Sequence, residues 1–408
     1  MDSPTQALAF EHPDHVPADL LWDHDFNLFT SEGNDPFRRV CELHDGPDLV
    51  WARRIDWRHG GWIPTRHALI REVLTDSEHF SSKSGDFMAT VGLDWPLIPL
   101  ELDPPQHQLY RKALEPFFSP TAVNALDGAV RQVCEQLMAG FEAADRCEFI
   151  TEFAQKFPSY IFLDIMGMPR DRLPEFLEWE RGMLHPVDAQ QQIASMQAIL
   201  TYLDAFIREQ RESATSDLMK SLLAARYGDE RPLTETEMLS IVFVLYIGGL
   251  DTVYGTLGWL FWYLTQDLPL QARLRERPED ITPAIEELLR AFSVTGSQRR
   301  VVKDCAFHGV RMRAGDRVLI SLALAGRDPQ AYADPHRVDI DRPVRHVAFG
   351  TGPHTCLGLR LAKREIRIVL EAFLAHCRDI RMPEGEHHAF HTGTVMGLDR
   401  LPLRWDPI

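Results

Sequence analysis

The sequence predicts a mainly α-helical protein with a minor β region, organised as a single domain over residues 21–408. Helical periodicity prevails across residues 122–223, with breaks expected at Pro158, at 167–169 and near 185–186. A capping box at Thr234–Glu237 opens a long apolar helix that we expect to run to about Gln266. Strand-like runs with turn residues are confined to short segments, which limits the β region to a small part of the fold.

Composition describes an ordinary soluble globular protein, with 45% hydrophobic and 25% charged residues. The net charge of -17 argues against nucleic acid or an anionic membrane as a partner, because both require a cationic surface. The six cysteines form no Cys-x-x-Cys, so they indicate neither a disulfide framework nor a zinc site and suit a reducing cytoplasm. Residues 1–20 lack the basic and apolar regions of a signal peptide, and we expect a flexible arm.

The N-terminal half begins with a β-hairpin predicted over residues 51–64, with Ile55 and Trp57 before the turn and Trp62 and Ile63 after it. A helix should follow from residues 65–74. Residues 81–99 have no sustained period and form an apolar loop of the kind that is usually functional.

Two further helices are predicted from their first residues. Asp103-Pro104-Pro105 precedes a helix in which His107 and Arg111 lie one turn apart on the same face. Ser119 and Pro120 supply the N-cap and first position of the next helix.

The long helix predicted from Glu235 is apolar enough to span a membrane, which is one alternative. Asp251 at its centre and the lack of flanking Lys or Arg argue against that alternative. Gly248 and Gly249 lower helix stability by ~1 kcal/mol each relative to alanine. They are explained either by close helix packing or by a need for open space.

Toward the C-terminus, residues 301–320 have the turn chemistry of a small sheet, and Thr282-Pro283 opens a helix in which Glu287 and Arg290 are spaced as an ion pair. The glycines of Phe349–Gly358 form a turn directly before another predicted helix. Cys356 therefore lies at or just before a helix N-terminus, which favours the thiolate, the form that acts as a ligand or a nucleophile; the alternative is a buried structural cysteine.

The segment Phe349-Gly350-Thr-Gly-Pro-His354-Thr-Cys356-Leu357-Gly358 resembles the haem-binding signature of the cytochrome P450 family. The resemblance implies the cytochrome P450 fold and a non-covalent haem b whose iron is bound by Cys356. It also implies that Phe349 shields the thiolate, that Gly350 lets the loop approach the porphyrin, and that the amides of Leu357 and Gly358 donate hydrogen bonds to sulfur.

Three more segments are similar to motifs of this family. By this resemblance His107 and Arg111 grip one haem propionate, with Arg299 and His354 as further propionate partners. Gly248-Gly249-Leu250-Asp251-Thr252 resembles the oxygen-activation motif, so Thr252 would hydrogen-bond the bound oxygen or its water and Asp251 would help to bring protons. Glu287 and Arg290 match a buried ion pair whose third member we expect to be Arg337.

The implied reaction inserts one atom of O₂ into a C–H bond and reduces the other to water, with two electrons from an acidic 2Fe–2S ferredoxin and its reductase. The alternatives are an H₂O₂-dependent peroxygenase and a non-catalytic haem-thiolate gas sensor. The basic residues that follow the cysteine would dock the ferredoxin, unless they form only a solvated helix face; they are Arg360, Lys363, Arg364 and Arg367, joined by Arg71 and Arg111.

The motifs look most like those of the soluble camphor-hydroxylating bacterial branch. We therefore expect a small apolar terpenoid or norisoprenoid as substrate, in a cytoplasmic protein without a membrane or nucleic-acid partner. The expected pocket residues are almost entirely apolar: Phe87, Met88, Trp95, Leu97, Leu100, Val244, Ile247, Gly248, Thr295 and Val395.

Overall fold

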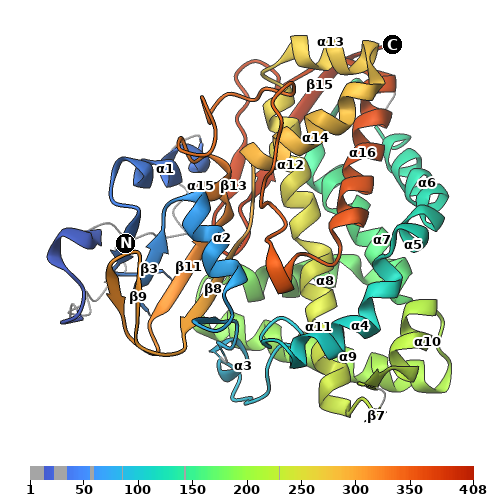
Figure 1. Ribbon diagram of the computed structural model, residues 1–408. Coiled ribbons are helices and arrows are strands. Elements are labelled where there is room, and N and C mark those ends of the chain that lie inside the picture. The colour runs from blue at the N-terminus through green and yellow to red at the C-terminus, as the bar shows by residue number, and fades with distance from the viewer. Residues whose placement is uncertain (1–12, 23–34, 56–58, 85, 142–143, 229) are drawn as a thin grey trace.

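A helical body lies beside a smaller β region in the computed structural model, which describes residues 13–22, 35–55, 59–84, 86–141, 144–228 and 230–408 (Figure 1). The mainly α prediction is confirmed. The α-helices are α1 (Pro36–Cys41), α2 (His67–Thr75), α3 (Asp86–Ala89), α4 (Gln106–Leu114), α5 (Pro120–Ala125), α6 (Asp127–Met138), α7 (Lys156–Met166), α8 (Leu173–Leu184), α9 (Ala189–Glu212), α10 (Asp217–Ala224), α11 (Glu235–Leu250), α12 (Thr252–Leu264), α13 (Leu268–Glu276), α14 (Ile281–Ala291), α15 (Leu322–Gly326) and α16 (Leu359–His376).

The largest sheet has the strand order β1-β2-β3-β11-β8-β4. The strands of the described residues are β1 (Leu21–Trp22), β2 (Leu49–Ala52), β3 (Gly61–Pro64), β4 (Phe80–Ser81), β5 (Arg146–Glu148), β6 (Arg226–Tyr227), β7 (Arg231–Pro232), β8 (Gly296–Val301), β9 (Cys305–Phe307), β10 (Val310–Met312), β11 (Arg317–Ser321), β12 (Cys377–Arg381), β13 (Ala389–His391), β14 (Gly397–Arg400) and β15 (Pro402–Pro407).

The predicted hairpin forms, with β2 antiparallel to β3 and Trp51 opposite Trp62. Their rings meet edge to face with centroids 5.1 Å apart, which stabilises the pair beyond its burial. Ile55 follows the first strand, and Trp57 lies outside the described residues.

The prediction of a flexible arm over residues 1–20 is wrong for the described residues 13–20. Residues 1–12 lie outside the described residues, but Val16 is buried and the His15 ring contacts the Asp316 carboxylate at 2.8 Å. Leu21 and Trp22 form β1 at the edge of the sheet. The segment from residue 13 onward is therefore part of the folded structure, because it covers apolar surface of the sheet.

A central column is formed by α11 and α12, which run one after the other through the helical body (Figure 1). The predicted capping box opens it, since Thr234 Oγ1 accepts from the Glu237 amide at 3.2 Å and Glu237 accepts from the Thr234 amide at 2.8 Å. The helix expected to run to about Gln266 is interrupted at Asp251, within the Gly248–Thr252 segment that resembles the oxygen-activation motif. The two preceding glycines weaken the helix at that point.

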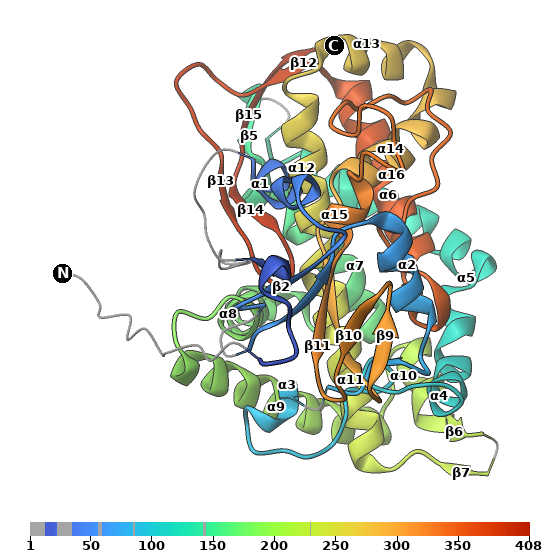
Figure 2. The same cartoon turned by 60° about the vertical axis from the view of Figure 1, so that its left-hand side comes forward.

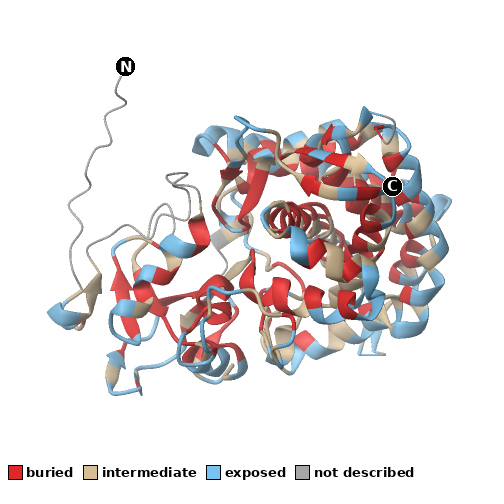
Figure 3. Ribbon diagram, turned by 90° about the horizontal axis from the view of Figure 1, so that it is seen from above, coloured by how far each residue is buried: buried red, intermediate tan, exposed pale blue. Residues whose placement is uncertain are grey.

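Glu235–Leu264 is the one stretch of the described residues that is long and apolar enough to cross a membrane. In its most apolar part, 56% of the residues are buried within the protein. Figure 3, viewed from above, shows this column nearly end-on in the middle of the molecule with other helices around it. Here its apolar side chains form a protein core.

The expected breaks near the middle of the chain are confirmed with one exception. Gly167 adopts a left-handed φ of 78° and ends α7, and α8 ends just before His185. Pro158 does not end a helix. It lies in the first turn of α7, where a proline removes no intrahelical hydrogen bond. The Ser119 cap is confirmed, with its hydroxyl accepting from the Ala122 amide at 3.3 Å.

Candidate active site

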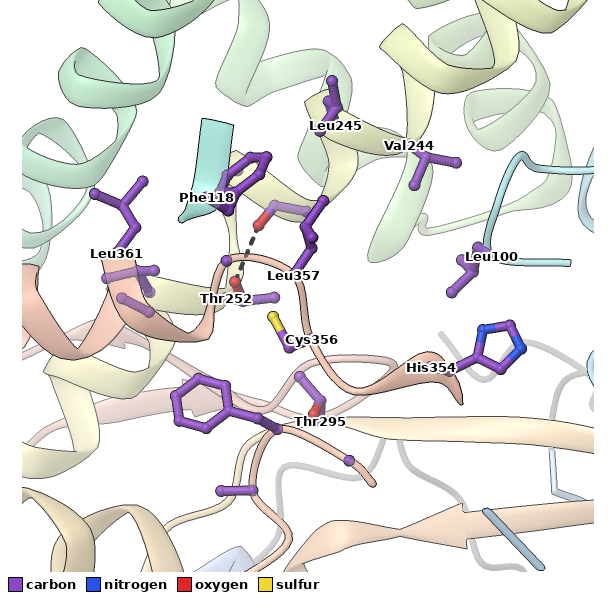
Figure 4. Close-up of a pocket in the computed structure, with 18 of the residues that line it drawn as sticks. Leu100, Phe118, Val244, Leu245, Thr252, Thr295, His354, Cys356, Leu357 and Leu361 are labelled. Atoms are coloured by element: carbon purple, nitrogen blue, oxygen red, sulfur yellow. Dashed lines mark hydrogen bonds between the residues drawn. The ribbon is translucent and has the colours of Figure 1, made fainter. Parts of the chain in front are cut away.

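A cavity of about 400 Å³ opens where α4, α11, α12, α16 and β8 meet (Figure 4). Its volume lies in the range of small-molecule and cofactor sites. The walls are mostly aliphatic and aromatic, and the polar groups are few. The residues that define its shape include Phe118, Phe162, Ile241, Leu245, Leu289 and Leu361.

Cys356 is the cysteine that borders this cavity, and its sulfur faces the open space in Figure 4. The chain reaches it through a tight turn in which Gly350 and Gly352 have left-handed φ values of 68° and 74°. A Cβ on Gly352 would lie 3.0 Å from the Leu74 carbonyl oxygen, so a side chain there would be strained. The Cys356 amide donates to the Phe349 carbonyl at 2.8 Å, which closes the loop before α16 begins.

The electrostatics of the sulfur differ from the prediction in two ways. Burial raises the pKa of the Cys356 thiol, and the opposing effects of the Gly358 and Leu359 amides and of Arg111 do not reverse this. Of the two amides expected to donate to the sulfur, that of Gly358 faces it, and the second is that of Leu359 instead of Leu357. Cys356 is exposed to the cavity, but the surrounding protein desolvates its thiolate more than the helix terminus stabilises it, so the pKa of the thiol stays raised.

Four cationic or ionisable side chains gather at one side of the cavity: His107, Arg111, Arg299 and His354. The imidazole rings of His107 and His354 have centroids 4.2 Å apart. Burial, followed by the neighbouring Arg299, lowers the pKa of His354 to about 3, and burial lowers that of Arg299 to about 10.

The hydrogen bonds of this group leave it under-satisfied. Both ring nitrogens of His107 are buried and have no hydrogen-bond partner among the described residues. Arg111 donates to the Thr355 carbonyl at 2.5 Å, and Arg299 donates to the Gln298 carbonyl at 2.8 Å. Arg111 also lies 3.7 Å from the exposed Glu115 carboxylate, whereas the buried Arg299 guanidinium favours a ligand that brings negative charge.

The two glycines of α11 have different roles. A Cβ on Gly249 would overlap the ring of Phe162, so this glycine permits close packing between α11 and α7. A Cβ on Gly248 would meet no atom within 4 Å, and Gly248 borders the cavity. Both glycines lower the stability of α11. Gly249 allows the close approach of α7, and Gly248 leaves open space in the cavity.

Asp251 and Thr252 are adjacent in the chain but face different surroundings. Thr252 borders the cavity, and its hydroxyl donates to the Gly248 carbonyl at 3.1 Å (Figure 4). Asp251 is fully buried and points toward the end of α8, where its Oδ2 atom lies 3.4 Å from His185 Nε2.

Part of the expected substrate pocket is found at the cavity. Leu100, Val244, Gly248 and Thr295 border it, whereas six residues do not: Phe87, Met88, Trp95, Leu97, Ile247 and Val395. The 86–89 segment forms the short helix α3, which turns Met88 into the core.

Two of the residues that do not border the cavity, Phe87 and Val395, have contacts elsewhere in the structure. Phe87 packs near Phe243 with ring centroids 6.2 Å apart. Val395 pairs with Thr295 through the backbone, but its side chain packs near Gly255 in the core beside α12.

Several bordering residues were not predicted, and only some carried a sequence signal. Ile241, Leu245 and Gly249 share the helical spacing of Thr252, so the 3.6-residue period could have assigned them to the same face. Phe118, Phe162 and Leu289 come from distant elements, and no local pattern identifies them.

The predicted ion pair between Glu287 and Arg290 is fully buried, with Nε–Oε2 and Nη2–Oε1 distances of 2.8 and 2.7 Å. The prediction that Arg337 is the third member of this ion-pair group is wrong. Arg337 is exposed and contributes only its carbonyl, which accepts from Arg290 at 3.1 Å. Arg342 lies against Glu287 instead, at 3.3 Å, because the loop after residue 337 turns back over α14.

The basic residues after Cys356 are mostly engaged in ion pairs. Lys363 pairs with Glu286, Arg364 with Asp127, and Arg367 with Glu371. Arg360 is exposed, and no ion pair involving it occurs in the described part of the chain.

Taken together, these features define a protein that binds a thiolate-ligated metalloporphyrin. A flat apolar ring with two carboxylates and a metal fits an apolar cavity that has one thiol and a group of cationic side chains on one side. The unpartnered nitrogens of His107 fit the same conclusion, since an anionic group would satisfy them.

The comparisons with known proteins agree. A model of the cytochrome P450 family matches residues 28–403. "Probable cytochrome P450 127A1" of Sinorhizobium fredii (strain NBRC 101917 / NGR234) is 36% identical over 404 residues, with 96% of each chain covered. "Polyketide biosynthesis cytochrome P450 PksS" of Bacillus subtilis (strain 168) is 30% identical, with 86% of this chain and 90% of that protein covered.

Solved structures give the same result. The crystal structure of CYP101J2 superposes with a TM-score of 0.85 at 30% identity, covering 97% of this chain and 99% of that one. CYP101C1 superposes with a TM-score of 0.86 at 29% identity, covering 97% and 100%. The chain belongs to the cytochrome P450 family, and is thus a haem b-binding oxidoreductase of the monooxygenase type.

Proposed function

We propose that this protein is a cytoplasmic, O₂-dependent monooxygenase that hydroxylates a compact apolar terpenoid or norisoprenoid, with Cys356 as the iron ligand. The observation that carries the proposal is that Cys356 and Thr252 border the same cavity, whose remaining walls are mostly apolar. Haem, when bound there, supplies the activation of O₂ with electrons from a partner protein.

The residues of the chain hold and orient the parts of this site. His107, Arg111, Arg299 and His354 would bind the carboxylates of the cofactor and keep it in one orientation. The amides of Gly358 and Leu359 would donate to the ligating sulfur, which stabilises its anionic form and tunes its electron donation.

Thr252 and Gly248 act on the opposite side of the cofactor space. Because the Thr252 hydroxyl donates to the Gly248 carbonyl, its oxygen lone pairs remain available to accept a hydrogen bond in the cavity. Gly248 leaves room for a diatomic molecule beside that hydroxyl. Asp251 would exchange protons between solvent and this region from its buried position behind the helix.

The substrate class follows from charge and volume. The ionised cavity side chains are needed for the cofactor carboxylates, so a charged substrate would leave an unpaired buried charge. Cofactor and substrate share this one cavity, so the substrate occupies only the part that the cofactor leaves free, which favours a compact molecule. Each CH₂ contributes only about 0.8 kcal/mol, so several related neutral molecules should bind.

The electron donor is proposed to be an acidic 2Fe–2S ferredoxin supplied by its reductase, which docks on the face that carries α16. The ion pairs of Lys363, Arg364 and Arg367 reduce the positive charge that these residues offer. Arg360 is therefore the strongest candidate contact on this helix.

The test compares two threonines on one helix. Thr252 and Thr256 both border the cavity and both donate to the carbonyl four residues earlier, at 3.1 and 2.8 Å. Thr252→Ala should consume reductant but divert a large share to H₂O₂, whereas Thr256→Ala should retain its product yield. Equal yields from both variants would remove Thr252 from the mechanism.

Two further measurements separate the alternatives. Cys356→Ala should lose the CO difference band of thiolate-ligated haem, and a wild-type spectrum of histidine-ligated haem would contradict the ligand assignment. Efficient turnover with H₂O₂ alone would favour a peroxygenase. Ligand binding without any turnover would favour a gas sensor.

A further inference from the structure

Behind the α11–α12 junction, away from the cavity, three side chains from distant parts of the chain converge. They are Asp251 at the junction, His185 at the end of α8 and His391 at the end of β13. One ligand atom of each lies within 4.8 Å of the other two. Figure 2 shows α8 and the β13–β14 hairpin on the same side of the molecule.

The polar atoms of this cluster lack the hydrogen bonds that buried groups ordinarily make. Asp251 is 0% exposed, and its Oδ1 atom makes no hydrogen bond of ordinary geometry, although the Glu180 carboxyl and the Tyr254 hydroxyl both interact closely with Asp251. His185 Nδ1 and His391 Nε2 are also buried without a partner. An unpaired buried acceptor costs about 1–3 kcal/mol, so the free Nε2 atom of His391 beside Asp251 and His185 points to a missing ligand.

His391 is oriented in the way that metal-binding histidines commonly are. Its Nδ1 atom lies 3.1 Å from Asp399 Oδ1, so the ring donates there and leaves the lone pair of Nε2 without a hydrogen bond. Asp399 in turn lies 3.5 Å from the guanidinium of Arg181. Burial raises the pKa of Asp399, but the hydrogen bond from His391 and the neighbouring Arg181 and His185 leave it lowered overall.

A carboxylate that holds one imidazole nitrogen and leaves the other free fixes both the tautomer and the direction of the ring. Gly397, which faces His391 across the β13–β14 hairpin, has no side chain, and a Cβ there would lie 2.7 Å from His391 Nε2. The ring therefore has little freedom to turn away.

The distances fit a metal better than a hydrogen-bonded chain. His185 Nε2 and Asp251 Oδ2 are 3.4 Å apart, which is long for a hydrogen bond between an imidazole and a carboxylate. Tetrahedral Zn²⁺ with bonds of about 2.0–2.2 Å holds its ligand atoms roughly 3.3–3.6 Å apart. A shift of about 1 Å by His391 would complete the set, with the fourth position open to water.

A second buried carboxyl, that of Glu180 on α8, lies beside Asp251 and is only 2% exposed. Burial, then the charge of Asp251 and a hydrogen bond with Asp251, raise the pKa of Glu180 well above its usual value. Glu180 therefore adds no negative charge to the cluster, and the proposed ligand set consists of the two imidazoles and the Asp251 carboxylate.

We propose that His185, Asp251 and His391 form a second metal site, distinct from the haem, for a divalent transition ion with the preferences of Zn²⁺. Two imidazoles and one carboxylate are ligands that suit Zn²⁺. The ligands come from positions up to 206 residues apart, and no short motif marks the site. Because Asp251 is a ligand, the metal would occupy the carboxylate to which the proposed function assigns proton exchange.

Binding is tested on the chelator-treated, haem-loaded protein by equilibrium dialysis against micromolar Zn²⁺. The wild type should bind one tightly held Zn²⁺, and His391→Gln and Asp251→Asn should bind it at least about 100-fold more weakly. Asp399→Asn, which changes only the group that orients His391, should weaken binding about 10- to 100-fold. A zinc absorption-edge spectrum should show nitrogen and oxygen neighbours without sulfur.

The control is His79→Ala, which removes a partly exposed histidine paired with Asp76 at 2.7 Å and should leave Zn²⁺ binding unchanged. A wild type that binds no stoichiometric Zn²⁺, or a Zn²⁺ site that survives in both His391→Gln and Asp251→Asn, would overturn the proposal. All variants are first checked for the CO band of the native haem site, and Asp399→Asn serves where a ligand variant does not fold.

The link to activity depends on the proposed function and can fail separately. Zn²⁺ should slow O₂-dependent turnover of the wild type, and His391→Gln should be far less sensitive to added Zn²⁺. Stoichiometric Zn²⁺ binding without slower turnover would establish the metal site and remove Asp251 from proton exchange. Absence of Zn²⁺ binding would overturn the metal site and leave the proposed function in place.

Discussion

The buried ion pair between Glu287 and Arg290 should be a major source of stability in this protein. Glu287 accepts hydrogen bonds from Arg290 at 2.7 and 2.8 Å and from the Asp339 amide at 2.9 Å, with Arg342 at 3.3 Å. Arg290 also donates to the carbonyls of Gly326 and Pro335 at 2.6 and 2.9 Å. Together these contacts hold α14, α15 and the loop that leads to the cysteine segment.

Glu287→Gln keeps the side-chain volume but leaves the buried guanidinium of Arg290 with neutral partners only. Removing one member of a buried ion pair typically costs about 3–5 kcal/mol, because the remaining charge is desolvated and unpaired. With a urea m value of roughly 3 kcal/mol/M, a loss of about 4 kcal/mol lowers the urea midpoint by about 1 M. Unfolding is followed in the haem-loaded protein by tryptophan fluorescence and by haem absorbance.

The matched control is the exposed pair of Arg208 and Asp204 on α9, which has a Nη2–Oδ2 distance of 2.6 Å. The Arg208 side chain is 76% exposed, so the pair is screened by solvent and should contribute no more than about 0.5 kcal/mol. Asp204→Asn should leave the midpoint nearly unchanged. If Glu287→Gln shifts the midpoint no further than Asp204→Asn, the argument from burial is refuted.

Three further predictions test other parts of the structure. Burial raises the pKa of Glu365 from 4.5 to about 8, so the stability present below pH 4.5 is lost as the pH rises through 8. Glu365→Gln should therefore stabilise the protein by roughly 3–5 kcal/mol at pH 8 and little at pH 4.5, as urea midpoints at both values will show. Gly249→Ala should lower the free energy of unfolding by about 1–3 kcal/mol through overlap with Phe162, whereas Gly248→Ala should fold normally and weaken the substrate-induced spin shift. Arg360→Glu should raise the KM for ferredoxin severalfold and reduce its dependence on ionic strength, and unchanged kinetics would place the donor elsewhere.

The elements that sequence predicted well are those specified by neighbouring residues. The capping box at Thr234 and Glu237, the Ser119 cap and the glycine that ends α7 all form as expected. Each depends on contacts within about four residues, so the local pattern contains the necessary information. The turn before Cys356 belongs to the same group, because its glycines adopt the left-handed conformations that the turn requires.

The features that sequence could not give depend on tertiary packing. Nothing in the segment 335–342 indicates that Arg342, rather than Arg337, lies against Glu287, because the choice depends on how the loop folds back. The sequence predicts that the loop 81–99 supplies several pocket residues. Instead, α3 turns Met88 into the core, and Leu100, which follows this loop, lies beside the cavity. Apolar composition predicts that a side chain will be buried, but it does not predict whether the side chain joins the protein core or the wall of the cavity.

The Asp251–Thr252 pair shows the same limit most clearly, and it connects the two proposed sites. Consecutive residues of a helix point about 100° apart, and at the interruption between α11 and α12 Asp251 does not border the cavity that Thr252 borders. Thr252 takes the cavity side, and Asp251 is left to find partners behind the helix, where the residues present are His185, His391 and Glu180. A carboxylate placed in that way can exchange protons only through the group behind it. A metal ion bound by His185, Asp251 and His391 would therefore make Asp251 unavailable for proton exchange. Metal binding and turnover should accordingly be measured on the same samples.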